Sequence, residues 1–503
     1  MQKDKILTIF AKFTKDLDSA AIISVNVYFL VSLAISSTKI SFLFSFIFFA
    51  FLVYYYSFYK AMVYSMLPLL YFGLGQIHSF IAVPASAVFS PQYWEGRQLV
   101  FSLSPFFIIF LSGLILLIFL WRKINLRFLM HEKMILILFA MFGLSFVGSV
   151  MPFISFAFTM NDLLLIVWGI YLVLATKNIS KLKVKKILLT LAIIFVAILL
   201  QNSLLVFGQI IKGGALGLAI ERTEVAPVFG LGADERAGVF RPFGFNIHPN
   251  GLANEVILIG ISILIMLQYL FEKFTKKNKT FNILVIAVFL VSLLIIILTL
   301  SRAAFVAIFL SLLFFAHRHP KQLKKIENLQ QRIASKSNPW LKVVIFIVLA
   351  VLTFKLTSRL FDTIYSFSEL GGVSTRIEQY KEAFEVFKNY PLFGVGVGMF
   401  MPASYQLFPD GIMRYFPEPV HNGFLLFLVE RGAFGAITYL IFLIYFYSEI
   451  SKLKLRKLTK TMIYLGIISS FVMMLFHPQN NFLSFLIVFI LFIIHYEKTN
   501  IKI

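Results

Sequence analysis

The sequence contains no cysteine, and charged residues are scarce: they make up 14% of the 503 residues, whereas 59% are hydrophobic. Without cysteine the chain can form no disulfide bond, no thiolate nucleophile and no cysteine-ligated metal site. A soluble globular protein needs roughly a quarter of its residues charged. The composition therefore excludes a soluble globular protein and predicts an all-α, polytopic integral membrane protein.

Acidic residues are especially few, with 23 Asp and Glu against 46 Lys and Arg and a formal net charge of +23. A nucleic-acid-binding protein would gather its cations on one solvated face. Here the cations lie in short clusters between apolar runs, which is typical of the cytoplasmic loops of membrane proteins. We therefore expect membrane lipids, and no nucleic acid, among the partners.

Apolar runs dominate the rest of the chain. A helix needs about 20 apolar residues to cross a bilayer, and about fourteen runs of that kind are present. Their approximate ranges are 19–37, 40–58, 61–80, 99–121, 134–157, 162–176, 187–209, 250–271, 281–300, 303–317, 342–358, 421–447, 461–477 and 481–496.

The distribution of basic residues predicts the orientation of these spans. Residues 1–18 are polar and basic without a cleavage site, so they indicate a cytoplasmic start rather than a signal peptide. With that start every second connection is strongly basic, as the positive-inside rule requires. Both termini are then cytoplasmic, and the connections near 81–98, 210–249 and 359–420 lie outside. We expect helices 1–7 in 1–209, the outer connections 210–249 and 359–420 within a central region at 210–447, and helices 13–14 in 448–503.

The largest outer connection, 359–420, contains an amphipathic pattern. Apolar residues recur at helical spacing from Ile377 to Phe387, with charged residues between them. Thr375 and Glu378 have the spacing of a capping box, and Pro391 would stop the helix. We expect a helix lying on the membrane surface.

Four short stretches carry charged, imidazole or amide groups where an apolar anchor ideally has none. The predicted topology puts all four on the outer face. They are Arg236–Gly244 with His248–Gly251, Leu300–Arg302, Ser374–Arg376 with the helix and the glycine-rich turn that follow it, and Pro419–Gly423 with Glu430–Gly432.

These stretches predict an anion site. Helices starting near 250, 303 and 421 would direct the positive ends of their dipoles to the outer face, with Asn250, Ser301 and Asn422 as caps. Guanidinium groups bind diphosphate through paired donors and stay cationic. The arginines at hand are Arg302, Arg241, Arg236 and Arg376.

Arg302 is the most informative of these arginines, because the connection between the predicted spans 281–300 and 303–317 is so short that the charge stays near the membrane. An arginine side chain at the centre of the bilayer would cost roughly 2.5–3.5 kcal/mol on insertion scales. Each of the other three arginines could equally be an interfacial anchor.

His421 is the best candidate for a general base. An ordinary histidine has a pKa of about 6.5, and nearby arginines would lower it and keep the ring neutral. Asn422 could orient this imidazole or cap its helix. His248, by contrast, has the position of a capping or packing residue. No spacing typical of a metal site occurs, so we expect a metal-independent reaction without cofactor.

The glycine-rich run at 394–398 lacks the Lys-Ser/Thr of a phosphate loop, so we interpret it as a flexible re-entrant turn.

Taken in order, these stretches resemble the O-antigen ligase superfamily, which also includes polysaccharide polymerases and bacterial O-oligosaccharyltransferases. The similarity covers about residues 230–440. It rests on R-P-F-G-F-x-x-H-P-N-x-L-A at 241–253, L-S-R at 300–302, R-x-x-x-Y-x-x-A-x-x-x-F-x-x-Y-P-L-F-G-V-G-x-G at 376–398 and H-N-G-F-L-x-x-L-x-E-x-G at 421–432.

The resemblance implies a GT-C-like glycosyltransferase of the bacterial cytoplasmic membrane, with its catalytic region in 210–447. It would take a glycan from undecaprenyl diphosphate at the outer face and transfer it, with inversion, to a glycan, lipid or protein acceptor. His421 maps to the family's base and Arg302 to a diphosphate ligand. Arg241 or Arg236 maps to a second ligand, Arg376 to the family's outer-loop arginine, and Glu430 falls in the last motif as a supporting residue.

A transporter remains an alternative to the transferase. About fourteen spans also suit a flippase for lipid-linked oligosaccharides, but a flippase should carry charged residues deep in both halves and show related halves. This sequence concentrates its polar groups at one face, which favours the transferase.

Overall fold

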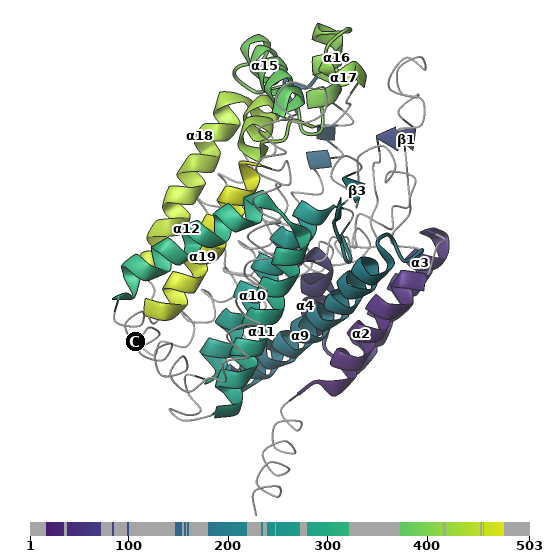
Figure 1. The fold of residues 1–503 in the computed structure, drawn as a ribbon, viewed down its shortest axis with the longest axis vertical. Coiled ribbons are helices and arrows are strands. Elements are labelled where there is room, and N and C mark those ends of the chain that lie inside the picture. The colour runs from purple at the N-terminus through teal and green to yellow at the C-terminus, as the bar shows by residue number, and fades with distance from the viewer. Residues whose placement is uncertain are drawn as a thin grey trace, which may run out of the picture.

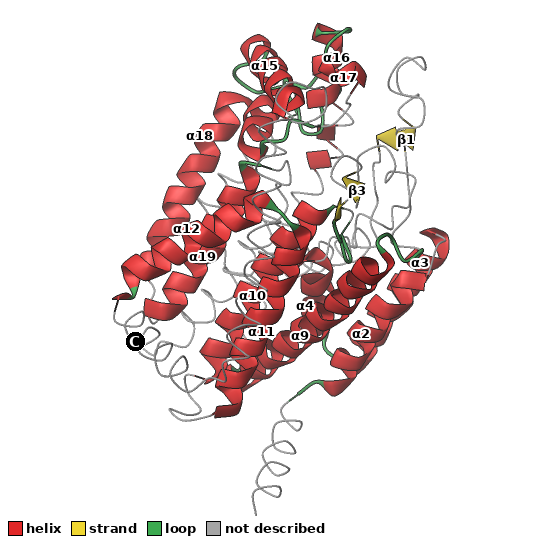
Figure 2. Ribbon diagram, in the orientation of Figure 1, coloured by secondary structure: helices red, strands yellow, loops and turns green. Residues whose placement is uncertain are grey.

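The protein is largely helical in the computed structural model (Figures 1 and 2). The described residues are 17–34, 38–71, 83–84, 98–99, 146–152, 155–156, 158–159, 180–218, 233–234, 239–246, 248–271, 279–320, 373–415, 419–452, 455 and 457–476.

The N-terminal half contributes four apolar helices. They are α2 (Ser19–Ala34), α3 (Thr38–Tyr55), α4 (Phe58–Tyr71) and α9 (Lys181–Lys212). Both α2 and α4 pack against α9, and α3 packs against α2 and α4. Gly213 ends α9 in the left-handed conformation, φ 68°, which glycine adopts without strain.

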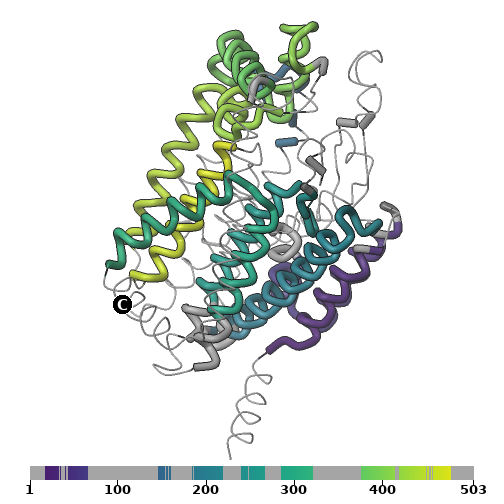
Figure 3. Tube along the Cα trace, viewed as in Figure 1, coloured from purple at the N-terminus to yellow at the C-terminus, as the bar shows by residue number. Residues whose placement is uncertain are grey.

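The second half of the bundle contains α10 (Pro249–Phe271), α11 (Lys279–Thr299), α12 (Arg302–Arg318), α18 (Gly423–Lys452) and α19 (Lys457–Met474). The central helix is α10, because it packs against α9, α11, α12 and α19. Figure 3 shows the N-terminal helices beside α9 on one side and the C-terminal helices on the other. One buried apolar core joins these helices from α2 to α19.

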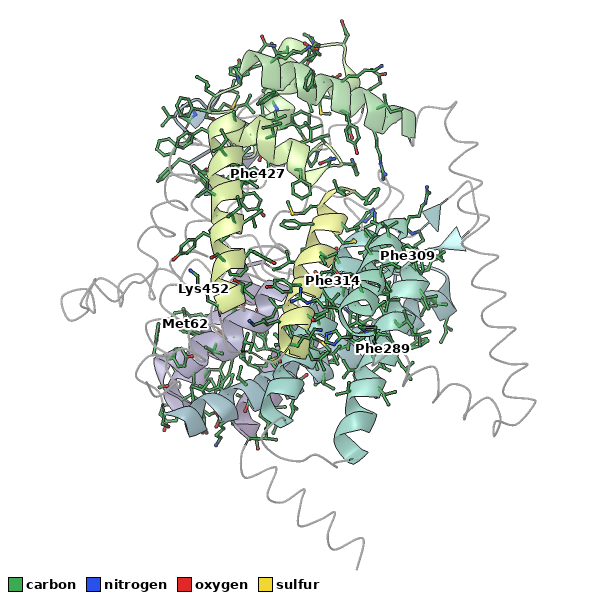
Figure 4. All side chains as sticks on the ribbon, turned by 90° about the vertical axis from the view of Figure 1, so that its left-hand side faces the viewer. Met62, Phe289, Phe309, Phe314, Phe427 and Lys452 are labelled. Atoms are coloured by element: carbon green, nitrogen blue, oxygen red, sulfur yellow. The ribbon has the colours of Figure 1, made fainter. Side chains whose placement is uncertain are left out.

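A second, smaller core lies at one end of the bundle. It contains α15 (Val373–Asn389), α16 (Phe400–Leu407), α17 (Ile412–Tyr415) and the first turns of α18. Figure 4 shows α15 lying across the end of α18 that carries Phe427, far from Lys452. Glu382 ties this cap together, since its carboxylate accepts from Ser404 Oγ at 2.6 Å and from Ile412 N at 2.5 Å.

Two pairs of very short strands lie in predicted outer connections. Antiparallel pairing joins β1 (Val83–Pro84) to β2 (Gln98–Leu99), and β3 (Ala233–Asp234) to β4 (Val239–Phe240). The described fold is therefore that of an all-α membrane protein with two minimal hairpins.

The ends of the helices can be matched through their contacts. Asp18, before α2, accepts from Lys60 Nζ at 2.8 Å and lies 3.0 Å from Lys186 Nζ, which joins the starts of α2, α4 and α9. The end of α12 meets the start of α19, because His319 Nε2 lies 2.9 Å from Thr461 Oγ1. Lys460 Nζ donates to Ser451 O, which joins α19 to the end of α18. The helix ends that these contacts bring together are ones that the prediction puts on the same side of the membrane.

Large apolar side chains cover the outside of the bundle. The second part of α18 exposes apolar residues at helical spacing, and α12 exposes Phe309 and Leu312. Such surfaces are costly in water and suit lipid. Three helical segments are long and apolar enough to cross a membrane: Lys186–Lys212, Pro249–Met266 and Gly423–Lys452. Shorter apolar segments occur at Ser19–Ser32, Leu43–Tyr55 and Val285–Thr299.

These helices confirm several predicted apolar spans. The predicted spans 162–176, 342–358 and 481–496, and 99–121 except Leu99, lie outside the described residues. The count of about fourteen and the GT-C class therefore stay predictions, as does the division at 209 and 447. The end of span 134–157 was predicted wrongly: residues 146–150 form a turn, because Val150 N donates to Val395 O of the cap at 3.0 Å.

Candidate functional site

Arg241 joins the end of one helix to the start of another. Its Nε donates to Thr299 O at 3.0 Å, and its Nη2 donates to Asn250 Oδ1 at 3.0 Å. Thr299 ends α11 and Asn250 lies in the first turn of α10, while α12 starts only two residues after α11. The first two predicted stretches, 241–251 and 300–302, therefore meet at one end of the bundle.

The connection between α11 and α12 is short and strained. Leu300 has φ 51°, the left-handed region that bulky side chains rarely adopt. Ser301 caps α12, because its side chain accepts from Ala304 N, as predicted. Arg302 follows as the first residue of α12 and is exposed. A cationic side chain thus stands at the positive end of a helix dipole, an arrangement that favours an anion beside it.

Two residues of α9 hold the loop before α10. Gln209 Oε1 accepts from Phe243 N at 3.0 Å and Gly244 N at 2.9 Å, and Asn202 Oδ1 accepts from Phe245 N at 3.1 Å. Sequence reasoning missed both residues. The signal that could have found them is the presence of three amides, Gln201, Asn202 and Gln209, in the mostly apolar run 187–209, where a buried amide needs a partner.

The start of α10 differs in detail from its prediction. His248 Nδ1 accepts from Asn250 N at 3.0 Å, which confirms His248 as a capping residue. The Asn250 side chain accepts from Arg241 instead of capping the helix.

His421 sits between α15 and the start of α18. Its Nδ1 lies 3.2 Å from Gln379 Oε1, and Tyr380 Oη donates to His421 O at 3.3 Å. With the Gln379 oxygen as acceptor, Nδ1 carries the ring proton and Nε2 keeps its lone pair. Gln379 is 1% exposed and was missed by sequence reasoning, because the apolar pattern that includes Ile377 and Phe384 marks a face that is exposed in the structure, whereas Gln379 lies on the buried face.

The electrostatic environment keeps the His421 ring neutral. Burial lowers the pKa of His421, and the positive charge of Arg376 lowers it further, to about 4. The sequence predicted this direction from the arginines alone, whereas burial is the larger cause. Asn422 caps α18 as predicted, since its Oδ1 accepts from Phe424 N and Leu425 N at 3.0 Å each.

Helix α18 is interrupted at Gly432, which has φ 65° and ψ −174°. Across this break the backbone exchanges hydrogen bonds with the loop after α15. Val395 N and Gly396 N donate to the carbonyls of Val429 and Glu430, and Ala433 N and Phe434 N donate to the carbonyls of Pro391 and Leu392. Two carbonyls before the break and two N–H groups after it thus find hydrogen-bond partners in this loop.

Glu430 fixes the same loop through its side chain. Its Oε1 accepts from Gly398 N at 2.9 Å, and the side chain is 6% exposed. Gly394, Gly396 and Gly398 all have positive φ, and a Cβ on Gly394 would meet the backbone of Glu430. The run forms a turn, as predicted, but hydrogen bonds hold this turn against α18, and the glycines are needed because they allow the close approach.

Not every predicted feature is found. The capping box at Thr375 is wrong, because α15 already begins at Val373 and the Thr375 hydroxyl is buried without a partner among the described residues. Arg236 lies outside the described residues and stays a prediction. The structure thus builds two clusters: the Arg241 cluster, with Asn250, Ser301 and Arg302, and the His421 cluster, with Gln379, Arg376, Asn422 and Glu430.

The two clusters lie at the same end of the bundle. Helices α12 and α18 both end where α19 starts, and α10 runs parallel to α12 through the intervening α11. The positive ends of α10 and α12 therefore point the same way, and the part of α18 that follows its break at Gly432 also starts at this end.

Comparison with known protein families finds a match to one segment of the chain. A family model described as O-Antigen ligase matches residues 287–440, a segment that contains Arg302, Arg376, His421 and Glu430. No curated protein matches the chain. Arg241 and Asn250 lie outside the matched segment. The predicted resemblance is thus confirmed over part of its range: from residue 287 to residue 440 this membrane protein is similar to the O-antigen ligases.

Proposed function

We propose that this chain is a glycosyltransferase of the bacterial cytoplasmic membrane, facing outside, that moves a glycan from undecaprenyl diphosphate to an acceptor hydroxyl. The match to the O-antigen ligase family supports glycosyl transfer in a membrane as the general class. The observation that carries the finer proposal is the neutral, amide-held imidazole of His421 at the end of the bundle where Arg241 and Arg302 stand.

The proposed step is a direct displacement. His421 Nε2 takes the proton of the acceptor hydroxyl, the acceptor oxygen forms a bond to the anomeric carbon, and the bond from that carbon to the diphosphate oxygen breaks. The anomeric configuration inverts, and the lipid diphosphate leaves as an anion. Arginines and helix starts stabilise the negative charge that develops on it, which is often the largest contribution to catalysis.

The acceptor distinguishes three members of this class. A ligase would use a lipid core, a polymerase the growing glycan chain and an O-oligosaccharyltransferase a protein hydroxyl. All three share the donor chemistry proposed above. Supplying each acceptor separately to the purified enzyme assigns the protein to one of them.

The test is transfer by purified full-length protein in lipid, with a glycan on undecaprenyl diphosphate as donor. We expect His421→Ala to reduce transfer by about 10²- to 10⁴-fold, the usual contribution of a general base. Arg302→Ala should reduce it by weakening diphosphate binding. His317→Ala is the matched control, because His317 is exposed at the opposite end of α12. We also expect a chelator to leave the rate unchanged.

Unchanged transfer in both His421→Ala and Arg302→Ala would overturn the residue roles. Lipid-linked glycan that crosses the bilayer without transfer would instead identify a flippase, and a rate abolished by chelator would contradict the metal-independent step.

A further inference from the structure

A continuous chain of hydrogen bonds leads from Arg241 into the membrane bundle. Arg241 Nη2 donates to Asn250 Oδ1, and Asn250 N donates to His248 Nδ1. His248 N then donates to Asn246 Oδ1 at 3.0 Å. Asn246 Nδ2 donates in turn to Glu255 Oε1 at 2.6 Å. The chain therefore ends on the carboxyl group of Glu255.

Glu255 is the unusual member of this chain. It lies in the second turn of α10 within the membrane-spanning segment and is 0% exposed. Its second oxygen, Oε2, has no hydrogen-bond partner among the described residues. An acidic group inside a membrane helix is expensive and marks a functional position by default. Neither the base nor the diphosphate ligands proposed above include it.

The local sequence makes room for the contact. The Asn246 side chain lies over Gly251, where a Cβ would collide with its amide group. Asn246 is 9% exposed, so both ends of its amide must find partners inside the protein. The carboxyl group of Glu255 accepts a hydrogen bond from the amide nitrogen of Asn246. The amide oxygen of Asn246 therefore faces His248 N.

We propose that Glu255 is a positioning residue for Arg241: through Asn246, His248 and Asn250 it sets the orientation in which the guanidinium meets the diphosphate of the donor lipid. The proposal rests on the proposed function, because it takes Arg241 as a diphosphate ligand. Glu255 itself does not touch the lipid in this scheme.

The proposal distinguishes two substitutions of similar size. Glu255→Gln keeps a carbonyl oxygen that can accept from Asn246, so the chain of hydrogen bonds survives. Glu255→Leu removes the acceptor and leaves a buried amide unpaired, which disturbs Asn246 and everything attached to it.

The experiment measures binding of undecaprenyl diphosphate to the purified full-length protein in lipid. We expect Glu255→Leu to weaken binding by about five- to tenfold, the equivalent of one hydrogen bond. Glu255→Gln should bind within about twofold of the wild type. Thermal unfolding of each variant tests whether the protein remains folded.

A double-mutant cycle separates positioning from general destabilisation. If Glu255 acts through Arg241, Glu255→Leu should cost little further affinity in an Arg241→Ala background. Should Glu255→Leu not fold, Asn246→Ala breaks the same chain in the loop before α10 and replaces it in the cycle.

The outcomes separate the two proposals. Equal binding by the wild type and Glu255→Leu, or full additivity with Arg241→Ala, overturns the positioning role while leaving the transferase intact. Failure of the wild type to bind the lipid diphosphate overturns the proposed donor, and the positioning role with it.

Discussion

At the scale of single residues, His421 depends on neighbours that are remote in sequence. Gln379 fixes which ring nitrogen carries the proton, and Arg376 helps to keep the ring neutral. Both come from α15, about forty positions earlier in the chain. The base and the helix that tunes it therefore form one unit, which the second hydrophobic core holds together.

The pH dependence of transfer tests this unit. A base works only unprotonated, and the pKa of His421 is lowered to about 4. Activity should therefore stay constant as pH falls through 6.5 and decline only near pH 4. Arg376→Gln removes the neighbouring positive charge, so the pKa should rise and the decline should begin at higher pH. The measurement is the initial rate of transfer against pH.

Lys388→Gln is the matched control, because it removes a positive charge from the same helix at an exposed site paired with Glu385. An acid limb that stays in place in Arg376→Gln would show that this arginine does not act on the base.

At the scale of elements, the break in α18 explains why two separate motifs belong together. The loop at 391–398 and the turn at 429–434 exchange backbone hydrogen bonds, so neither is complete without the other. The first part of α18 packs in the cap, whereas the part after Gly432 exposes apolar side chains. The break thus lies at the junction of the cap and the membrane bundle.

Gly432→Ala tests this junction. A residue with a side chain is strained at φ 65°, and its Cβ would meet the backbone of Leu392 and Gly394. We expect a loss of at least about 1–2 kcal/mol in the free energy of unfolding. The loss should appear as a lower melting temperature of the purified protein.

The comparison is Gly214→Ala, since a Cβ at Gly214 enters open space and its φ is not positive. A Gly432→Ala variant as stable as Gly214→Ala would contradict the strain at the break.

At the scale of the whole molecule, orientation in the membrane decides whether the site can meet an outward-facing donor. The contacts determine which helix ends lie together, and the clusters of lysine and arginine predict which of those ends is cytoplasmic. Because the chain contains no cysteine, any introduced cysteine is the single reactive thiol.

Two single-cysteine variants test the orientation. The variant Lys381→Cys changes a residue on the exposed face of α15. The variant Lys457→Cys changes the first residue of α19, at the opposite end of the bundle. In intact cells a membrane-impermeant maleimide should label Lys381→Cys only. Lys457→Cys should react after the membrane is permeabilised. The reverse pattern would place His421 on the cytoplasmic side.

Much of the architecture could be predicted because a bilayer imposes simple demands. Apolar runs of sufficient length become helices, and α10 and α11 begin and end within two residues of their predicted positions, whereas α9 begins six residues before its predicted start. The caps Ser301 and Asn422 were also predictable, since capping depends on a few adjacent residues. Such features require only local sequence.

The errors arose where distant segments meet. The glycine run and the end of the span at 134–157 were interpreted from composition alone, but their structure depends on packing against α18 and the cap. Gln209, Asn202 and Gln379 have no local motif, and their roles follow from partners at least thirty positions away.

From the sequence by itself we could predict that the chain enters a membrane, how its helices would alternate and which arginines and histidine would gather at one end, because hydropathy and charge act locally. Tertiary structure alone decided which groups touch: the Gln379–His421 pair, the interrupted helix at Gly432 and the hydrogen bonds from Arg241 to Glu255. Hydrogen bonds are short and directional, so only the folded backbone can bring such partners within reach.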